Sequence, residues 1–224
     1  MIKLLVFDMA GTTIDEQNVV YKTLQSSINA FEYPVSLKEV LAKGAGMEKY
    51  DAIQHIVREA FDPDVEDEKL ENIFDHFKKN LKANYKDLKV QEQNGAYATL
   101  HELKKKGKLI ALNTGYNKKT AKSLLKKLEW KKGKAYHTLV TASDVENSRP
   151  APDMIFKVMD KLNIKDVKEV AKIGDSCIDI IEGRNAGCGL CIGITSGAQT
   201  REQLSAVNPD FIIDDLSELL NLIP

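Results

Sequence analysis

Short apolar runs alternate with amphipathic stretches along most of the chain. A strand that is covered on both faces is apolar throughout, and the following runs have this pattern: Ile2–Phe7, Leu109–Asn113, Thr138–Thr141, Val170–Ile173, Gly189–Ile194 and Phe211–Ile213. Between them, apolar residues recur at helical spacing in Tyr97–Lys106, Lys118–Leu128, Asp153–Leu162 and Ile178–Ala186. Alternating strands and helices predict an α/β fold, a doubly wound parallel sheet with helices on both faces.

One region breaks the alternation. Residues 16–88 contain no convincing strand and keep helical periodicity, for example at Ile53, Ile56 and Val57. An all-helical block between the first and second strands of a parallel sheet indicates an inserted domain. We therefore predict a helical cap at 16–88 and an α/β core formed by 1–15 and 89–224.

Composition and charge narrow the range of partners. The 224 residues carry 32 Lys and Arg against 33 Asp and Glu, a balance that predicts no nucleic-acid partner. No apolar run approaches the ~20 residues of a membrane span, so we expect no membrane partner. Three cysteines without a framework spacing are typical of a reducing compartment, and no signal-peptide pattern is present, so a cytoplasmic location is expected. Monomer and homodimer both stay open.

Polar side chains stand where the apolar runs end. Asp8 follows the first run, Thr114 and Gly115 follow the second, and Asp175 follows the run at 170–173. Ligands of open α/β sheets bind beyond the carboxyl ends of strands, so these residues are candidates for one site. Asp179 comes four residues after Asp175, on the same side of the following helix.

Four segments in this order resemble the haloacid dehalogenase superfamily over essentially the whole chain. They are Asp8-Met-Ala-Gly-Thr, Asn113-Thr-Gly-Tyr, Ser148-Arg-Pro-Ala-Pro-Asp and Gly174-Asp-Ser-Cys-Ile-Asp. The resemblance implies an aspartate nucleophile, Asp8, and a Mg²⁺ cofactor. It implies Asp8, the Ala10 backbone carbonyl and Asp175 as metal ligands, with Asp179 bracing the water shell or Asp175. It also implies that Thr114, the Gly115 amide and Arg149 bind the phosphoryl group.

Simpler roles remain open for some of these residues. Thr114 could cap an ordinary turn, Ser176 and Asp179 could cap a helix, and Arg149 could lie on the surface. Tyr116 could either line the substrate pocket or only pack.

Two departures from the superfamily pattern narrow the chemistry. Ala10 stands where the phosphatases of the superfamily have an acid/base aspartate, and Arg149 stands where most members have lysine. Both resemble phosphonoacetaldehyde hydrolases, which cleave a carbon–phosphorus bond through a lysine Schiff base. Lys49, after Gly44-Ala-Gly-Met-Glu, matches that lysine. The family's histidine and methionine near it are Ala52 and Ala45 here, and His55 is expected to point elsewhere.

Three functions follow as hypotheses. The leading one is a Mg²⁺-dependent hydrolase of phosphonoacetaldehyde or a related phosphonate, with Asp8, Lys49 and Arg149 as catalytic residues. The alternative is a phosphatase or phosphoryl-transfer enzyme that acts on a small phosphorylated metabolite. A non-catalytic phosphometabolite-binding protein is the third.

Overall fold

The computed structural model describes residues 1–223. Its main sheet has six parallel strands in the order β5-β4-β1-β6-β7-β8. The strands are β1 (Leu4–Phe7), β4 (Leu109–Thr114), β5 (Thr138–Thr141), β6 (Val170–Gly174), β7 (Leu190–Ile194) and β8 (Phe211–Ile213). The predicted doubly wound α/β fold is confirmed, with strand ends within two residues of the expected ones.

Helices cover both faces of this sheet. They are α5 (Ala96–Lys105), α6 (Lys118–Lys127), α7 (Asp153–Leu162), α8 (Cys177–Ala186), α9 (Arg201–Ser205) and α10 (Leu219–Leu222). Successive side chains of β1 point to opposite faces of the sheet, which explains why helices pack on both faces. Leu5 and Phe7 belong to one apolar core with α5 and α6, while Leu4 and Val6 belong to another with α7 and α8. Every side chain of β1 is therefore buried.

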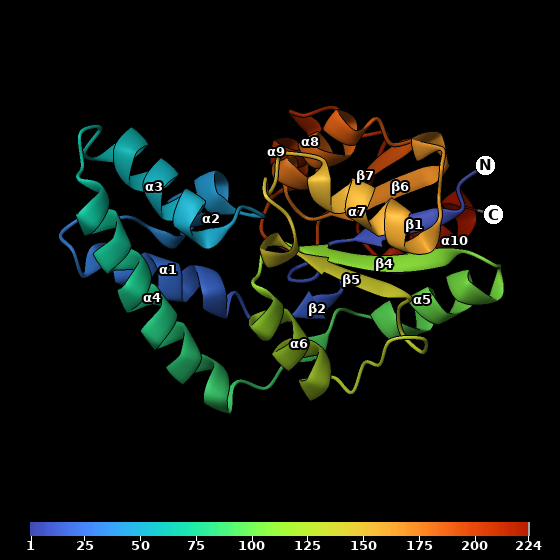
Figure 1. The fold of residues 1–224 in the computed structure, drawn as a ribbon, viewed down its shortest axis with the longest axis horizontal. Coiled ribbons are helices and arrows are strands. Elements are labelled where there is room, and N and C mark those ends of the chain that lie inside the picture. The colour runs from blue at the N-terminus through green and yellow to red at the C-terminus, as the bar shows by residue number, and fades with distance from the viewer. Residues whose placement is uncertain (224) are drawn as a thin grey trace.

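The region between β1 and α5 holds four helices, α1 (Val19–Asn29), α2 (Leu37–Gly44), α3 (Lys49–Ala60) and α4 (Asp67–Asp87). In Figure 1 they form a separate lobe beside the sheet, which we call the cap. Their inward faces are apolar, with Leu24, Ile53, Ile56 and Ile73 fully buried.

Two very short strands that the sequence did not predict join the cap to the core. β2 (Ile14–Asp15) precedes α1, β3 (Gln91–Glu92) follows α4, and the two pair antiparallel. A strand of two residues carries no readable periodicity. This pairing holds the two crossings between core and cap side by side.

No helix in residues 1–223 is long and apolar enough to cross a membrane.

Candidate active site

The three central strands of the sheet bring the predicted polar residues to one edge. Asp8 follows β1, Thr114 ends β4 and Asp175 follows β6, and β1 is hydrogen-bonded to both neighbours. All three side chains are buried. The Thr114 hydroxyl accepts a hydrogen bond from the Tyr116 amide at 3.2 Å, which shapes the loop after β4.

Arg149 lies in the loop before α7 and is not a surface residue. Its Nη1 is 2.7 Å from Asp8 Oδ1, and its Nη2 donates to the Asn113 side chain at 2.7 Å. Nε donates to Glu182 Oε2 at 2.9 Å. Burial opposes the charged form, but the carboxylates of Asp179, Glu182 and Asp8 together raise the Arg149 pKa. The guanidinium is therefore a fixed cation beside the predicted nucleophile.

Behind Arg149, the charged side chains of Lys172, Asp179 and Glu182 are fully buried. Lys172 Nζ is 2.6 Å from Asp179 Oδ1 and 3.6 Å from Glu182 Oε2, and Asn113 donates to both oxygens of Glu182. The sequence patterns do not single out Asn113, Lys172 or Glu182 as site residues. Two features of the sequence could have indicated them. Asn113 and Lys172 are polar residues inside apolar strands, and Glu182 is a carboxylate three residues after Asp179.

Asp179 is fully engaged by side chains. Oδ1 meets Lys172 and, at 3.0 Å, Arg149 Nη1, while Oδ2 accepts the Ser176 hydroxyl at 2.5 Å. Burial would raise the Asp179 pKa, but Arg149 and Lys172 lower it, so the carboxylate is ionised. The structure places it against cations and Ser176, and its role at a metal stays a prediction.

Lys172 makes a testable contribution to stability. Replacing it by methionine, which is similar in volume, leaves Asp179 and Glu182 buried with Arg149 as their remaining cation. Removing one partner of a buried pair costs about 3–5 kcal/mol, so Lys172→Met is expected to lower the free energy of unfolding by that order. Urea denaturation at pH 7 measures it, with exposed Lys165→Met as the control; equal stability of the two variants would contradict the prediction.

The buried charges do not balance. Four carboxylates (Asp8, Asp175, Asp179 and Glu182) face two cations (Arg149 and Lys172), which leaves two excess negative charges. Asp175 receives only neutral donors, the Thr12 hydroxyl at 3.1 Å and the Ala198 amide at 2.6 Å. Burial, with repulsion from Asp8 and Asp179, raises its pKa to about 8. Burial likewise raises the Asp8 pKa to about 6, against the pull of Arg149.

This excess fits a divalent cation. Mg²⁺ takes oxygen ligands and keeps several waters, so it needs few carboxylates. Within residues 1–223, no three His, Cys, Asp or Glu side chains already converge as ligands of one ion. Asp8 and Asp175 would supply two oxygens, and the predicted third protein ligand is the Ala10 carbonyl.

The raised pKa values predict how Mg²⁺ changes stability. Between about pH 4 and pH 8 the folded Asp8 and Asp175 bind more protons than the unfolded chain, so their contribution to stability falls as pH rises. We expect Mg²⁺ to raise the melting temperature more at pH 8 than at pH 5. Calorimetry with Mg²⁺ and with EDTA tests this, and Asp175→Asn should remove most of the difference. A shift independent of pH would contradict the metal assignment.

The cap contributes Lys49, which begins α3 and is 6% exposed. Its ammonium donates to the Met47 carbonyl and lies 5.1 and 5.8 Å from the ring centroids of Tyr21 and Tyr116. Burial lowers the Lys49 pKa to about 8, against the attraction of carboxylates. Glu48, Asp8, Glu16 and Arg149 are the charged groups that interact electrostatically with its ammonium.

Glu16 is a further buried carboxylate that the sequence did not single out. It is 2% exposed at the start of the cap, where Oε2 accepts the Val20 amide at 3.2 Å. Burial raises its pKa to about 7.

The loop before Lys49 closes the cap onto the core. A Cβ atom on Gly115 would lie 2.9 Å from the carbonyl oxygens of both Gly46 and Met47, so this close approach requires glycine. The Gly46 amide donates to the Tyr21 hydroxyl at 3.0 Å. The glycine-then-lysine segment is thus a loop leading into a helix, as predicted, and it covers Gly115 in the loop after β4.

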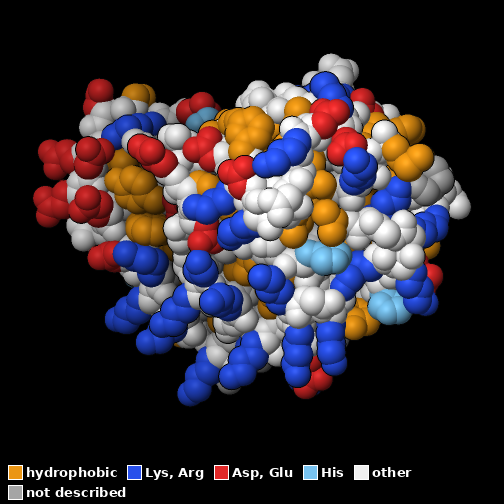
Figure 2. Space-filling model, turned by 45° about the vertical axis from the view of Figure 1, so that its right-hand side comes forward, with side chains coloured by type: hydrophobic (Ala, Val, Ile, Leu, Met, Phe, Trp, Pro, Cys, Tyr) orange, Lys and Arg blue, Asp and Glu red, His pale blue; other side chains and the backbone are white. Residues whose placement is uncertain are grey.

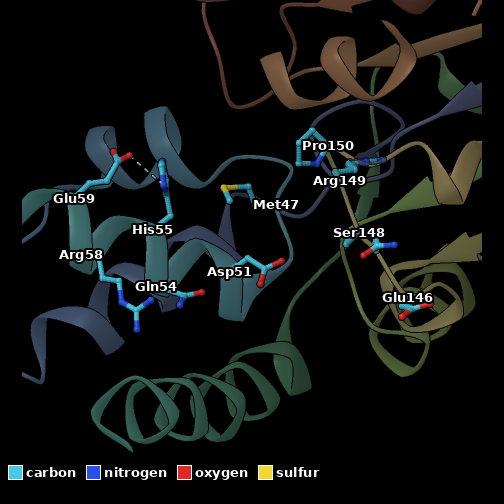
Figure 3. Close-up of a pocket in the computed structure, with 11 residues that line it drawn as sticks. Met47, Asp51, Gln54, His55, Arg58, Glu59, Glu146, Ser148, Arg149 and Pro150 are labelled. Atoms are coloured by element: carbon cyan, nitrogen blue, oxygen red, sulfur yellow. Dashed lines mark ion pairs between the residues drawn. The ribbon is translucent and has the colours of Figure 1, made fainter. Parts of the chain in front are cut away.

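Two cavities border this contact. One of about 660 Å³ lies between α3 and residues 146–150, where Met47, His55 and Arg149 line it (Figure 3). In Figure 3, His55 faces Glu59 of the same helix. The other cavity, of about 640 Å³, is lined by Lys49, Gly115 and Tyr116 and lies between α4 and α6. Lys49 and His55 therefore serve different cavities, as their spacing predicted.

A parallel α/β core with a carboxylate beside a fixed guanidinium, closed by a helical cap, places the protein in the class of capped α/β proteins. Residues 5–192 match the model of the haloacid dehalogenase-like hydrolases. The chain belongs to this family.

Several relatives resemble the chain over nearly its whole length. Pyrophosphatase PpaX of Bacillus cereus is 27% identical over 225 residues, 99% of this chain and 96% of that protein. The solved structure of a phosphonoacetaldehyde hydrolase-like protein from Oleispira antarctica has a TM-score of 0.86 at 21% identity, covering 99% and 91% of the two chains. That of a predicted phosphoglycolate phosphatase from Haemophilus somnus has 0.79 at 19%, covering 100% and 98%. At these identities the structures show the fold alone.

Proposed function

We propose that the protein is a Mg²⁺-dependent phosphatase that releases phosphate from a small phosphorylated metabolite. The curated relatives are named for pyrophosphate hydrolysis, which supports cleavage of a bond from oxygen to phosphorus. Our leading sequence hypothesis, carbon–phosphorus cleavage, has less support from the relatives. The observation that carries the proposal is the buried Lys49 ammonium, whose charge interacts with that of Asp8, in a site that has alanine at position 10.

Each residue then has a chemical role. Asp8 attacks phosphorus, the bond to the leaving oxygen breaks, and water later hydrolyses the aspartyl phosphate. Arg149, held by Asn113 and Glu182, orients Asp8 and can reach phosphoryl oxygens, while Thr114 and the Gly115 amide face the same group. Mg²⁺ held by Asp8 and Asp175 would neutralise charge on the phosphoryl group.

The leaving oxygen needs a proton, and Ala10 cannot supply it. A general acid works best when its pKa lies near the operating pH, and burial brings the Lys49 pKa to about 8. We assign Lys49 as the proton donor in place of the absent aspartate.

Carbon–phosphorus cleavage remains a second candidate because the same lysine favours it. A buried amine with a lowered pKa is partly neutral near pH 8, and a neutral amine can attack an aldehyde to form a Schiff base. This chain has Ala45 and Ala52 where the phosphonoacetaldehyde hydrolases have a methionine and a histidine. It therefore differs from them beside the lysine that would form the Schiff base.

The pH dependence of turnover separates the two functions. A proton donor must be protonated, so kcat for phenyl phosphate is expected to fall as pH rises through about 8. A Schiff-base lysine must be neutral, so acetaldehyde release from phosphonoacetaldehyde would instead rise toward pH 8. Phosphate release from phenyl phosphate that declines above pH 8 supports the phosphatase. Inactivation by borohydride only when phosphonoacetaldehyde is present, without phenyl phosphate turnover, would overturn it.

A further inference from the structure

The cavity between α4 and α6 is larger than a phosphoryl group needs. Its volume is about 640 Å³, within the range of sites that bind whole organic ligands. It reaches the site at Lys49, Gly115 and Tyr116, and Phe74, Phe77 and Leu81 of α4 give it an apolar wall. A pyrophosphate or a two-carbon acid would leave most of this wall uncovered.

Two tyrosines that line this cavity place their hydroxyl groups near each other. The buried hydroxyl oxygens of Tyr85, on α4, and Tyr116, on the loop after β4, interact with each other, and neither has a hydrogen-bond partner within 3.5 Å among the residues that the structure describes. Buried polar groups are normally paired, so a ligand that fills the cavity and draws either hydroxyl toward it would gain a hydrogen bond. Because they come from the cap and the core, such a ligand would contact both lobes.

The rim of the cavity is basic. Six lysines and one glutamate line it. Lys127 donates to backbone carbonyls of the α4 end and Lys78 pairs with Asp75. The exposed side chains of Lys82, Lys86 and Lys119 have no ion-pair partner among the side chains that the structure describes, which do not include that of Asp87. Figure 2 shows basic side chains gathered in a band along the lower left of the molecule, below an apolar patch on the cap.

We propose that this cavity binds the leaving group of the substrate, and that this group has an apolar, ring-bearing body with an anionic group at its far end. The proposal rests on the proposed phosphatase function. The apolar wall would cover the ring, the two tyrosine hydroxyls would bond its polar atoms, and the free lysines would attract its charge. The substrate class is thus an aryl phosphate that carries a further carboxylate or phosphate.

Two synthetic substrates test the effect of a negative charge at the far end of the leaving group. 4-(2-Carboxyethyl)phenyl phosphate and 4-propylphenyl phosphate have the same ring and chain length and differ in the terminal carboxylate. We expect kcat/KM to be about 10-fold higher for the carboxylate, because a lysine-lined cleft concentrates anions. The double variant Lys82→Glu/Lys119→Glu should abolish or invert this preference, whereas exposed Lys165→Glu should retain it.

Acetyl phosphate, whose leaving group is too small to fill the cavity, reports the phosphatase function separately. Equal kcat/KM for the two aryl phosphates, or a preference that survives in the double variant, would overturn the leaving-group proposal while acetyl phosphate turnover keeps the phosphatase. If the wild-type protein with Mg²⁺ hydrolyses none of the three, the phosphatase function fails and the leaving-group proposal falls with it.

Discussion

Asp8→Asn is expected to abolish phosphate release, lowering kcat by roughly 10⁴-fold or more, as loss of a catalytic nucleophile does elsewhere. The amide has nearly the same shape but cannot attack phosphorus as an anion. The fold should survive, because the substitution removes one carboxylate from a buried cluster that has two in excess. Release of inorganic phosphate from phenyl phosphate with saturating Mg²⁺ measures the effect.

Exposed Asp160→Asn on α7 is the matched control and should keep wild-type turnover. The melting temperature of Asp8→Asn should be equal to or above that of the wild type at pH 8 without metal, where the Asp8 carboxylate is buried and ionised. Activity of Asp8→Asn within 10-fold of the wild type would exclude Asp8 as the nucleophile.

Lys49→Met is expected to have the second largest effect. Loss of a general acid costs roughly 10²–10⁴-fold, so turnover of phenyl phosphate, whose leaving oxygen needs a proton, should fall by that amount. Turnover of 4-nitrophenyl phosphate, whose leaving group departs as an anion, should fall much less. The decline of kcat above pH 8 should also disappear, because the group that titrates there is gone.

The free energy of unfolding of Lys49→Met distinguishes loss of the proton donor from loss of the fold. Methionine places an apolar side chain where an ammonium is buried between Tyr21 and Tyr116, so the free energy of unfolding should stay the same or rise. Lys43→Met, on the neighbouring cap helix, is the control for removing a cap lysine. An equal loss for both phosphates in Lys49→Met would contradict the proton-donor role.

Much of the fold was readable from the sequence because its strands are buried on both faces. Uninterrupted apolar runs such as Leu4–Phe7 and Val170–Gly174 stand out from the amphipathic helices between them. The β2–β3 pair was not readable, since two-residue strands show no period. Helix ends shifted by one residue, for example at Ala96 and Cys177, where the periodicity does not mark the first turn.

The candidate site, like the fold, contains residues that the sequence predicts and contacts that it does not. Asp8, Thr114 and Asp175 were predictable because each follows an apolar strand and strand ends meet at one edge. The contacts of Glu182 and Lys172 with Arg149 and Asp179 were not, because they depend on how α8 packs across the sheet. The approach of the Tyr85 hydroxyl to that of Tyr116 likewise depends on how the cap closes on the core.

A nucleophilic Asp8 carries the phosphoryl group during turnover. Quenching the reaction of 4-nitrophenyl phosphate in acid at millisecond times, followed by peptide mass spectrometry, tests it directly. We expect a hydroxylamine-sensitive phosphoryl group on the peptide that contains Asp8, absent without Mg²⁺. Steady turnover with no phosphoryl group on that peptide at any time, or with one on another residue, would contradict it.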